Sequence, residues 1–196
     1  NETKTLPLAP RTKVYFESYY QQVPSRPGPA ATPNPAASAS KVFADDAKKY
    51  NLEFVKTPEE ADVVLLWITP GSKSLFASDG SPIYLSLSKN QVDVSYINAL
   101  TAKKPTILAI NYTNPWVIDE VYNATTQGRI KGIIATFGTT TDALLDIVTG
   151  KFKPTGKMPF TTPVSEAAVQ AQKTDVPGYL EGPGYALLKY AEGLHY

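Results

Sequence analysis

The sequence contains no cysteine and a single histidine, His195, which is the penultimate of its 196 residues. Without cysteine there can be no disulfide and no thiolate metal site, and one histidine cannot form a histidine cluster around a metal ion. We therefore expect neither a metal nor a cofactor. A serine hydrolase with a nucleophile elbow is excluded as well, because the chain has no Gly-x-Ser-x-Gly motif and its only histidine is terminal.

An excess of charge of one sign and long apolar runs are also missing. The chain has 19 basic and 18 acidic side chains, a formal net charge of +1, and no dense basic run. It therefore lacks the electrostatic footprint of a nucleic-acid-binding protein. No apolar stretch approaches the roughly 20 residues that span a bilayer, so we expect no membrane partner. The first ten residues lack the apolar region of a signal peptide and look like internal sequence.

Hydrophobic residues make up 42% of the chain, and they are concentrated in short runs that predict β-strands. The run at 62–68 is almost continuously apolar, which is typical of a parallel strand buried on both faces. The predicted strands are Lys13–Glu17, Leu52–Val55, Asp62–Ile68, Pro105–Ile110 and Gly132–Phe137.

Helical patterns lie between these runs, and together they predict a single α/β domain over residues 1–196 with a mainly parallel sheet. The segment Thr140–Val148 is followed by Gly150, a residue common just past a helix end. The predicted helices are Lys41–Tyr50, Gln91–Ala102, Pro115–Tyr122 and Thr140–Val148.

Two segments do not fit the alternation of strands and helices. Residues 18–39 are rich in Pro, Ala and Ser and predict a surface loop rather than a recognition arm. Residues 150–196 contain many turn residues and few helical periods, so we expect an extended tail that packs across the sheet or covers an edge. Ligands of open parallel sheets bind beyond the carboxyl ends of the strands. Here those loops are Ser18–Ala39, Thr69–Asn90, Asn111–Asn114 and Gly138–Thr141.

The strand-end loops contain two candidate acid/base carboxylates, Glu17 and Asp79. Hydrolysis of a glycosidic bond normally uses two carboxyl groups at a fixed separation. Simpler roles compete, because Asp79-Gly80 is a good turn pair and Glu17 could be solvated. The segment Gly138–Thr141 could bind an anion at a helix N-terminus, or its threonines could cap the helix. Trp67 and Trp116 could stack on sugar rings or pack in the core.

The stretch GKFKPTGKMPFTTP at 150–163 is not a phosphate-binding loop, because five residues rather than four separate its glycines and Met158 follows Lys157. Instead, FGTTTDALLDIVTGKFKPTGKMPFTTP (137–163) resembles the C-terminal domain of family 3 glycoside hydrolases. That family shows a helix followed by Gly-x-x-x-Pro-x-Gly-Lys-Leu/Met-Pro. The stretches NETKTLPLAPRTKVYFESY, DVVLLWITP, PTILAINYTNPWVI and GPGYALLKYAEGLHY are also similar, so the resemblance covers nearly the whole chain.

The resemblance implies a three-layer α/β sandwich with a roughly six-stranded sheet, acting as the second domain of a retaining β-glycosidase. Family 3 enzymes hold a β-linked glycoside between this domain and an N-terminal (β/α)₈ barrel that carries the nucleophile. The barrel is absent from these 196 residues and would be supplied in cis or in trans. We therefore expect the isolated chain to be inactive. A non-catalytic module that binds carbohydrate or protein is the alternative. A flavodoxin-like nucleotide or receiver domain is disfavoured, because this sequence lacks the Gly-rich loop after the first strand and the acidic cluster that such domains need.

The family places its acid/base glutamate in the loop that corresponds to residues 69–90. That loop contains no glutamate, and Asp79 is its only carboxylate, so Asp79 becomes the acid/base candidate and Glu17 a weaker one. The family's terminal Phe-Gly-x-Gly-Leu is replaced here by Tyr-Ala-Glu-Gly-Leu at residues 190–194. The same loop would shape the sugar subsites, and its candidate substrate-binding residues are Lys73, Phe76 and Ser78.

Three Asn-x-Ser/Thr sequons begin at Asn1, Asn111 and Asn123. They matter only in a secreted protein, which is the localisation that the resemblance implies. We expect these three asparagines to be glycosylated if the chain is secreted.

Overall fold

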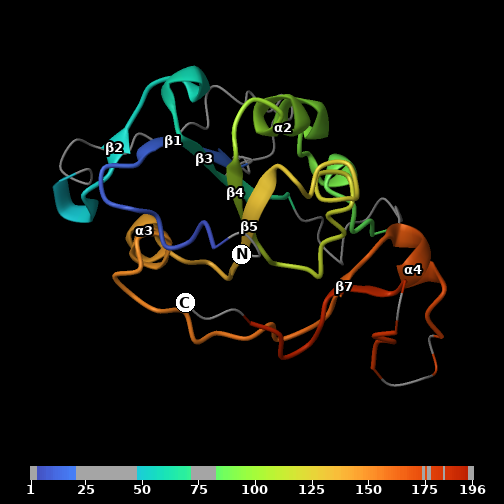
Figure 1. Ribbon diagram of the computed structural model, residues 1–196. Coiled ribbons are helices and arrows are strands. Elements are labelled where there is room, and N and C mark those ends of the chain that lie inside the picture. Colours follow the sequence, from blue (N-terminus) through green and yellow to red (C-terminus); the bar gives the residue numbers. More distant parts are fainter. Residues whose placement is uncertain are drawn as a thin grey trace, which may run out of the picture.

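The computed structural model describes residues 4–20, 48–71, 83–173, 175, 178–182 and 184–193. Within these residues a five-stranded parallel sheet has the strand order β2-β1-β3-β4-β5 (Figure 1). Its core strands fall where the apolar runs predict them. The strands are β1 (Lys13–Tyr20), β2 (Glu53–Phe54), β3 (Val63–Thr69), β4 (Thr106–Asn111) and β5 (Ile130–Thr136).

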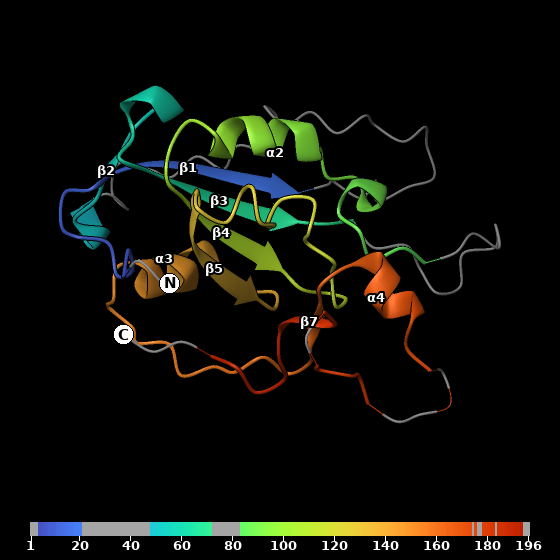
Figure 2. The same ribbon diagram turned by 45° about the vertical axis from the view of Figure 1, so that its right-hand side comes forward.

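Helices cover both faces of this sheet, which confirms the α/β sandwich (Figure 2). Helix α2 (Val94–Thr101) lies on one face and α3 (Thr141–Val148) on the other. Two short 3₁₀ turns, η2 (Pro58–Glu60) and η3 (Ser88–Asn90), lie in the connections. No helix among the described residues is long and apolar enough to cross a membrane.

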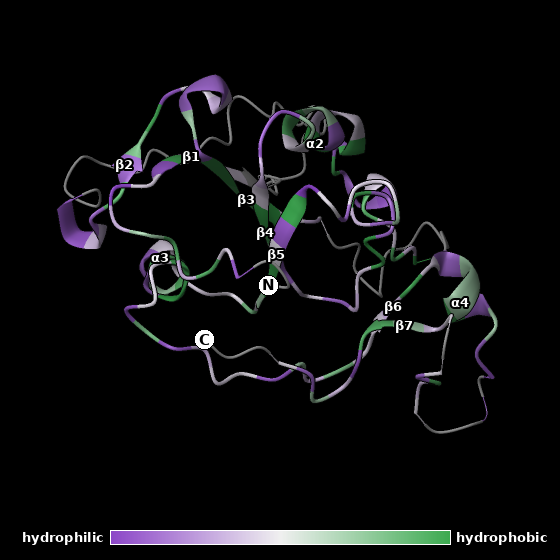
Figure 3. Cartoon of the chain, viewed as in Figure 1, coloured by the Kyte–Doolittle hydropathy of each residue, from purple (hydrophilic) through white to green (hydrophobic). Residues whose placement is uncertain are grey.

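The near-continuous apolar sequence of β3 follows from its burial on both faces. Val64, Leu66 and Ile68 pack into the core beneath α2, whereas Val63 and Leu65 pack into the core beneath α3. Alternate residues of a strand point to opposite faces, so a strand between two helical layers needs apolar residues at every position. Figure 3 shows this distribution, with apolar residues gathered in the central strands and hydrophilic ones in η2.

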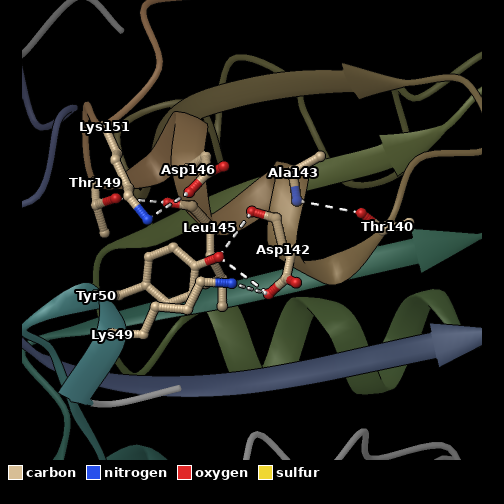
Figure 4. A network of polar contacts seen from close by, with 9 residues as sticks. All are labelled: Lys49, Tyr50, Thr140, Asp142, Ala143, Leu145, Asp146, Thr149 and Lys151. Carbon is tan, nitrogen blue, oxygen red and sulfur yellow. Dashed lines mark hydrogen bonds and ion pairs between the residues drawn. The ribbon is translucent and has the colours of Figure 1, made fainter. Parts of the chain in front are cut away.

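The ends of α3 are set by the residues that the sequence indicates. The hydroxyl of Thr140 accepts from the backbone N–H of Ala143 at 3.3 Å, so threonine caps the helix. After the helix, Gly150 adopts φ 71°, the left-handed conformation that stops a helix. Figure 4 shows how the first turn is tied to the segment before β2: Lys49 pairs with Asp142 at 3.1 Å, and the Tyr50 hydroxyl donates to the same carboxylate at 3.0 Å.

Helix α2 and the segment before β2 agree with the predicted helices as far as they are described. Helix α2 begins after Asp93, whose carboxylate accepts from the backbone N–H of Tyr96 at 2.9 Å. Residues 48–50 are helical, and the rest of the predicted helix 41–50 lies outside the described residues.

The predicted helix at Pro115–Tyr122 is wrong. Trp116, Val117 and Ile118 are all fully buried, and Val117 donates its backbone N–H to Leu85 at 2.9 Å. Successive side chains of an extended segment point to opposite faces, so all three are buried because both faces of this segment are covered. The extended form also forms a parallel bridge between Ser86 and Val117.

The tail forms a small sheet of its own rather than a further strand of the main sheet. Strands β6 (Thr162–Pro163) and β7 (Ala186–Leu188) pair antiparallel, and α4 (Glu166–Gln170) lies between them in sequence. The described main sheet therefore has five strands, not six. Phe160 and Leu187 pack against the core beneath α2, so the tail does attach to the sandwich.

The tail also differs from expectation just after α3. A turn at Pro154 and Gly156 is expected from sequence, but residues 153–158 contain no turn. Instead, Met158 exchanges backbone hydrogen bonds with a later part of the tail, donating to Glu192 at 2.7 Å and accepting from Ala191 at 2.9 Å.

Candidate functional site

The strand order creates a crevice at the carboxyl end of the sheet. The chain leaves β1 toward β2 and leaves β3 in the opposite direction toward β4, so the two connections diverge. Ligands of doubly wound sheets bind at such a switch point. A cavity of about 220 Å³ lies there, lined by Ser18, Trp67, Thr69, Asn111, Gly138 and Thr139.

Asn111, the last residue of β4, organises the wall of this cavity. Its Oδ1 accepts from the backbone N–H of Gly138 at 2.8 Å and from the hydroxyl of Thr136 at 3.3 Å. The Thr136 hydroxyl accepts in turn from the indole Nε1–H of Trp67 at 3.1 Å. A hydroxyl has one proton to donate and lone pairs to accept, so this chain is self-consistent. It fixes an amide and an indole across β3, β4 and β5.

The lining supplies hydroxyls, an amide and an indole, but no carboxylate from the described residues. Hydroxyl and amide groups recognise the hydroxyls of a polar ligand, and the flat apolar face of an indole packs against a ring. Proton transfer to a leaving group needs an acid of suitable pKa within reach. The described wall is therefore equipped for binding rather than for acid catalysis.

Glu17 directly precedes the cavity residue Ser18, but it is not part of the lining. Its side chain is only 1% exposed and lies between β1 and α2. The Tyr15 hydroxyl donates to its Oε2 at 2.8 Å, and the Tyr96 hydroxyl donates to Oε1 at 2.9 Å and to Oε2 at 2.7 Å. These two phenols supply the hydrogen-bond donors that the buried carboxylate needs, and no cation among the described residues pairs with it. An acid/base role for Glu17 stays a prediction, and this geometry gives it no access to the cavity.

The two phenols remain protonated at neutral pH. Burial, together with the hydrogen bond to Glu17, raises the pKa of Tyr15 to about 12. Burial is also the main cause that raises the pKa of Tyr96, and the neighbouring Glu17 raises it further. Both side chains therefore act as permanent donors to the carboxylate across the physiological range.

The remaining candidates of the loop after β3, Lys73, Phe76, Ser78 and Asp79, lie outside the described residues. The base of that loop is described, and it is closed by a backbone hydrogen bond from Gly71 to Asn90 at 2.9 Å. The catalytic and substrate-binding roles of these residues stay predictions.

The other predicted sites are placed as follows. Within Gly138–Thr141, Thr140 caps α3 and Gly138 donates to Asn111, so part of the proposed anion site has internal partners. Asn123 is exposed in a turn, where its amide donates to the carbonyl of Asp119 at 2.8 Å. Asn1 lies outside the described residues. No group of carboxylates and histidines among the described residues could hold a metal ion.

Sequence reasoning missed the role of Asn111 as the hydrogen-bonding centre of the cavity and treated it as a sequon. The available signal was its position, because a polar residue that ends a buried parallel strand lies at the ligand-binding edge. Ser18 and Thr69 were inside the predicted loops, but nothing in the sequence singled them out.

Comparison with known proteins decides the family. The model of the glycosyl hydrolase family 3 C-terminal domain matches residues 1–196, the entire chain. The chain belongs to this family. Beta-glucosidase C of Emericella nidulans is 33% identical over 147 residues, which cover 74% of this chain and 22% of that protein. A periplasmic beta-glucosidase/beta-xylosidase of Dickeya chrysanthemi is 28% identical over 141 residues, covering 69% of this chain and 21% of that protein.

Solved structures show the same fold for this family 3 domain. The β-D-glucoside glucohydrolase of Trichoderma reesei superposes with a TM-score of 0.65 at 14% identity, over 100% of this chain and 34% of that one. A β-glucosidase of Listeria innocua, solved with isofagomine, gives a TM-score of 0.61 at 16% identity, over 99% of this chain and 31% of that one. This chain spans about a fifth of the length of the curated relatives that it matches.

Proposed function

We propose that this chain is the second domain of a retaining β-glycosidase of the β-glucosidase type. It forms one wall of a sugar cleft whose other wall is a (β/α)₈ barrel, supplied in cis or in trans. The observation that supports this most strongly is the family match over residues 1–196, combined with a coverage of about a fifth of the curated relatives. The ligand is a β-linked glucoside or a related oligosaccharide, in line with a beta-glucosidase and a beta-glucosidase/beta-xylosidase among the relatives.

In this proposal the carboxylates are divided between the two domains. Retaining hydrolysis uses a nucleophile and an acid/base about 5–5.5 Å apart. The nucleophile comes from the barrel, as the family resemblance implies, and the described cavity lining, which holds no carboxylate, is in line with this. Asp79 is the acid/base candidate of this chain, and Lys73, Phe76 and Ser78 contact the sugar. The Trp67 indole and the Asn111 amide contribute to the fixed wall beside them.

The test compares the isolated chain with its assembly with the barrel domain on aryl β-glucosides and β-xylosides. The isolated chain is expected to be inactive and the assembly active, and robust hydrolysis by the isolated chain would refute the division of carboxylates. In the assembly, Asp79→Asn should impair alkyl glucosides far more than dinitrophenyl glucosides. A good leaving group does not need protonation, so the difference isolates the acid role. Equal losses on both substrates would remove Asp79 from that role.

A non-catalytic carbohydrate-binding module is the second candidate, and the absence of a carboxylate from the described part of the cavity lining favours it. Calorimetric titration of the isolated chain with glucose, xylose and N-acetylglucosamine oligomers distinguishes the two. A module binds one of these ligands without a barrel, whereas half of a cleft does not.

We also propose that the protein is exported from the cytoplasm, since one relative is described as periplasmic. Glycosylation at Asn1, Asn111 and Asn123 would follow in a eukaryotic secretory pathway. Asn123 is exposed, whereas Asn111 is engaged in the cavity wall, so Asn123 is the more accessible of these two acceptors. Peptide mapping after endoglycosidase treatment of the secreted protein tests this.

A further inference from the structure

The connection from β3 to α2 returns to the sheet through a limb, residues 84–90, that is held by carboxylates from distant parts of the chain. The limb follows directly after the stretch that carries the predicted site residues. One attachment comes from Glu166, the first residue of α4 in the tail. One oxygen of Glu166, Oε1, accepts from the backbone N–H of Leu85 at 2.8 Å and from that of Ser86 at 2.7 Å.

Further contacts fix the rest of the limb. Glu120 accepts from the backbone N–H of Ser88 at 2.9 Å and from its hydroxyl. The side-chain amide of Asn90 donates to the carbonyls of Tyr84 and Ser86, both at 2.8 Å. The limb is therefore defined at its backbone rather than merely packed, and Glu166 holds the end that faces the loop.

The Glu166 contacts are not explained by the needs of α4 itself. The helix already has a cap, because the Ser165 hydroxyl accepts from the backbone N–H of Ala168 at 3.1 Å. The start of the tail helix is anchored separately by the bond from the Val164 N–H to the Tyr185 carbonyl at 3.0 Å. Glu166 is half-buried and turns its charge toward two backbone donors of another segment. Hydrogen bonds to an ionised acceptor are about twice as strong as neutral ones.

We propose that Glu166 is a positioning residue, which fixes the return limb of the β3–α2 connection and thereby sets the cleft wall of the glycosidase. The inference rests on the proposed function. It gives the tail a task in catalysis, because α4 couples a segment near the end of the chain to the loop after β3. Glu166 acts through Leu85 and Ser86 and does not itself touch the sugar.

Three variants separate the contributions to this role. Glu166→Ala removes the acceptor from both N–H groups. Glu166→Gln keeps an oxygen that can accept both bonds and removes the charge. Glu181→Ala is the matched control, because it deletes a carboxylate from the same tail whose described partners, Thr161 and Tyr190, also lie within the tail.

The first readout is amide hydrogen exchange of peptides from residues 84–92, measured on the isolated chain and on the assembly with the barrel. Glu166→Ala should speed exchange at Leu85 and Ser86 about tenfold or more, since each loses its acceptor. Glu181→Ala should stay within about twofold of the parent chain, and Glu166→Gln should fall between Glu166→Ala and the parent because its neutral oxygen accepts the two bonds more weakly. Unchanged exchange in Glu166→Ala would overturn the inference.

The second readout is steady-state kinetics of the assembly on an aryl β-glucoside. Glu166→Ala should lower kcat roughly tenfold, because misplacing a catalytic wall by about 1 Å can cost a hundredfold, while KM changes little. Glu166→Gln should restore part of kcat, because its oxygen still accepts both hydrogen bonds but without the charge. A Glu166→Ala enzyme with a lower Tm but the parent kcat below its transition would show a merely structural residue and refute the inference. If the parent assembly has no β-glycosidase activity, the proposed function fails, and the exchange experiment still decides the positioning of the limb.

Discussion

Replacing Tyr96 by phenylalanine tests the most deeply buried charge in the described structure. Glu17 is 1% exposed, and Tyr96 provides two of its three phenol contacts, at 2.9 and 2.7 Å. A hydrogen bond to a charged group contributes about 1.5–3 kcal/mol to the free energy of unfolding. We therefore expect Tyr96→Phe to lower that free energy by about 2 kcal/mol. For a domain of this size the Tm should fall by about 4–8 °C.

Urea unfolding, followed by circular dichroism, measures this loss as a lower midpoint with an unchanged slope. Tyr190→Phe is the control, because Tyr190 is 64% exposed. The same Tyr96→Phe change in a Glu17→Leu background should cost less than half as much, since no buried carboxylate then needs a donor. A loss below about 0.5 kcal/mol, or an equal loss in both backgrounds, would refute the account of Glu17 as a carboxylate satisfied by phenols.

Three further predictions follow from the tail, from the first turn of α3 and from the buried phenols. Gly193→Ala would place a Cβ 2.4 Å from the carbonyl oxygen of Gly156. We therefore expect the free energy of unfolding, measured in urea, to fall by about 1–3 kcal/mol. A neutral effect would contradict the close approach of the two segments. The hydrogen bond to Lys49 lowers the pKa of Asp142, so its contribution to stability is present above the unfolded pKa of about 3.9 and is lost as pH falls through the lower folded pKa. Thermal melts between pH 5 and 2 should accordingly show a shallower decline for Asp142→Asn than for the parent, and parallel curves would argue against the pair. Burial raises the pKa of Tyr112 to about 12, so the stability that the buried, neutral Tyr112 contributes is complete below pH 10 and is lost as pH rises toward 12. Absorbance at 295 nm should therefore show tyrosines that ionise only with alkaline unfolding. A single titration near pH 10 would contradict this.

The strands and the helix α3 could be predicted from sequence because their signals are local. An unbroken apolar run such as Val63–Ile68 fits only a strand covered on both faces, and Thr140 and Gly150 mark the ends of α3 by their own conformational preferences. The segment Pro115–Tyr122 was mispredicted because its state depends on a partner distant in sequence. It bonds to the loop at Leu85, a contact that no window around Trp116 contains.

The candidate site was harder to predict because it is assembled from strand ends. Topology predicted that ligands bind at the carboxyl edge of the sheet, where the structure has a cavity, yet the sequence could not show that Asn111 joins β4 to Gly138 after β5. It also could not show that Glu17 is buried under α2, because the alternation along β1 defines a face but not what covers it. The resemblance to the family rests on spaced sequence motifs, which identify the domain over residues 1–196 without locating any side chain.

The hydrogen bond that joins Gly71 to Asn90 closes the base of the loop after β3 independently of what lies between them. With both ends anchored, residues 72–82 can be exchanged or lengthened without disturbing the strand before or the helix after. Doubling the length of such a loop costs only about 0.6 kcal/mol in closure entropy. The domain thus fixes the two ends of this connection at Gly71 and Asn90 on a constant frame. If the proposed function holds, we expect replacement of residues 72–82 to change sugar specificity while the sandwich stays unchanged.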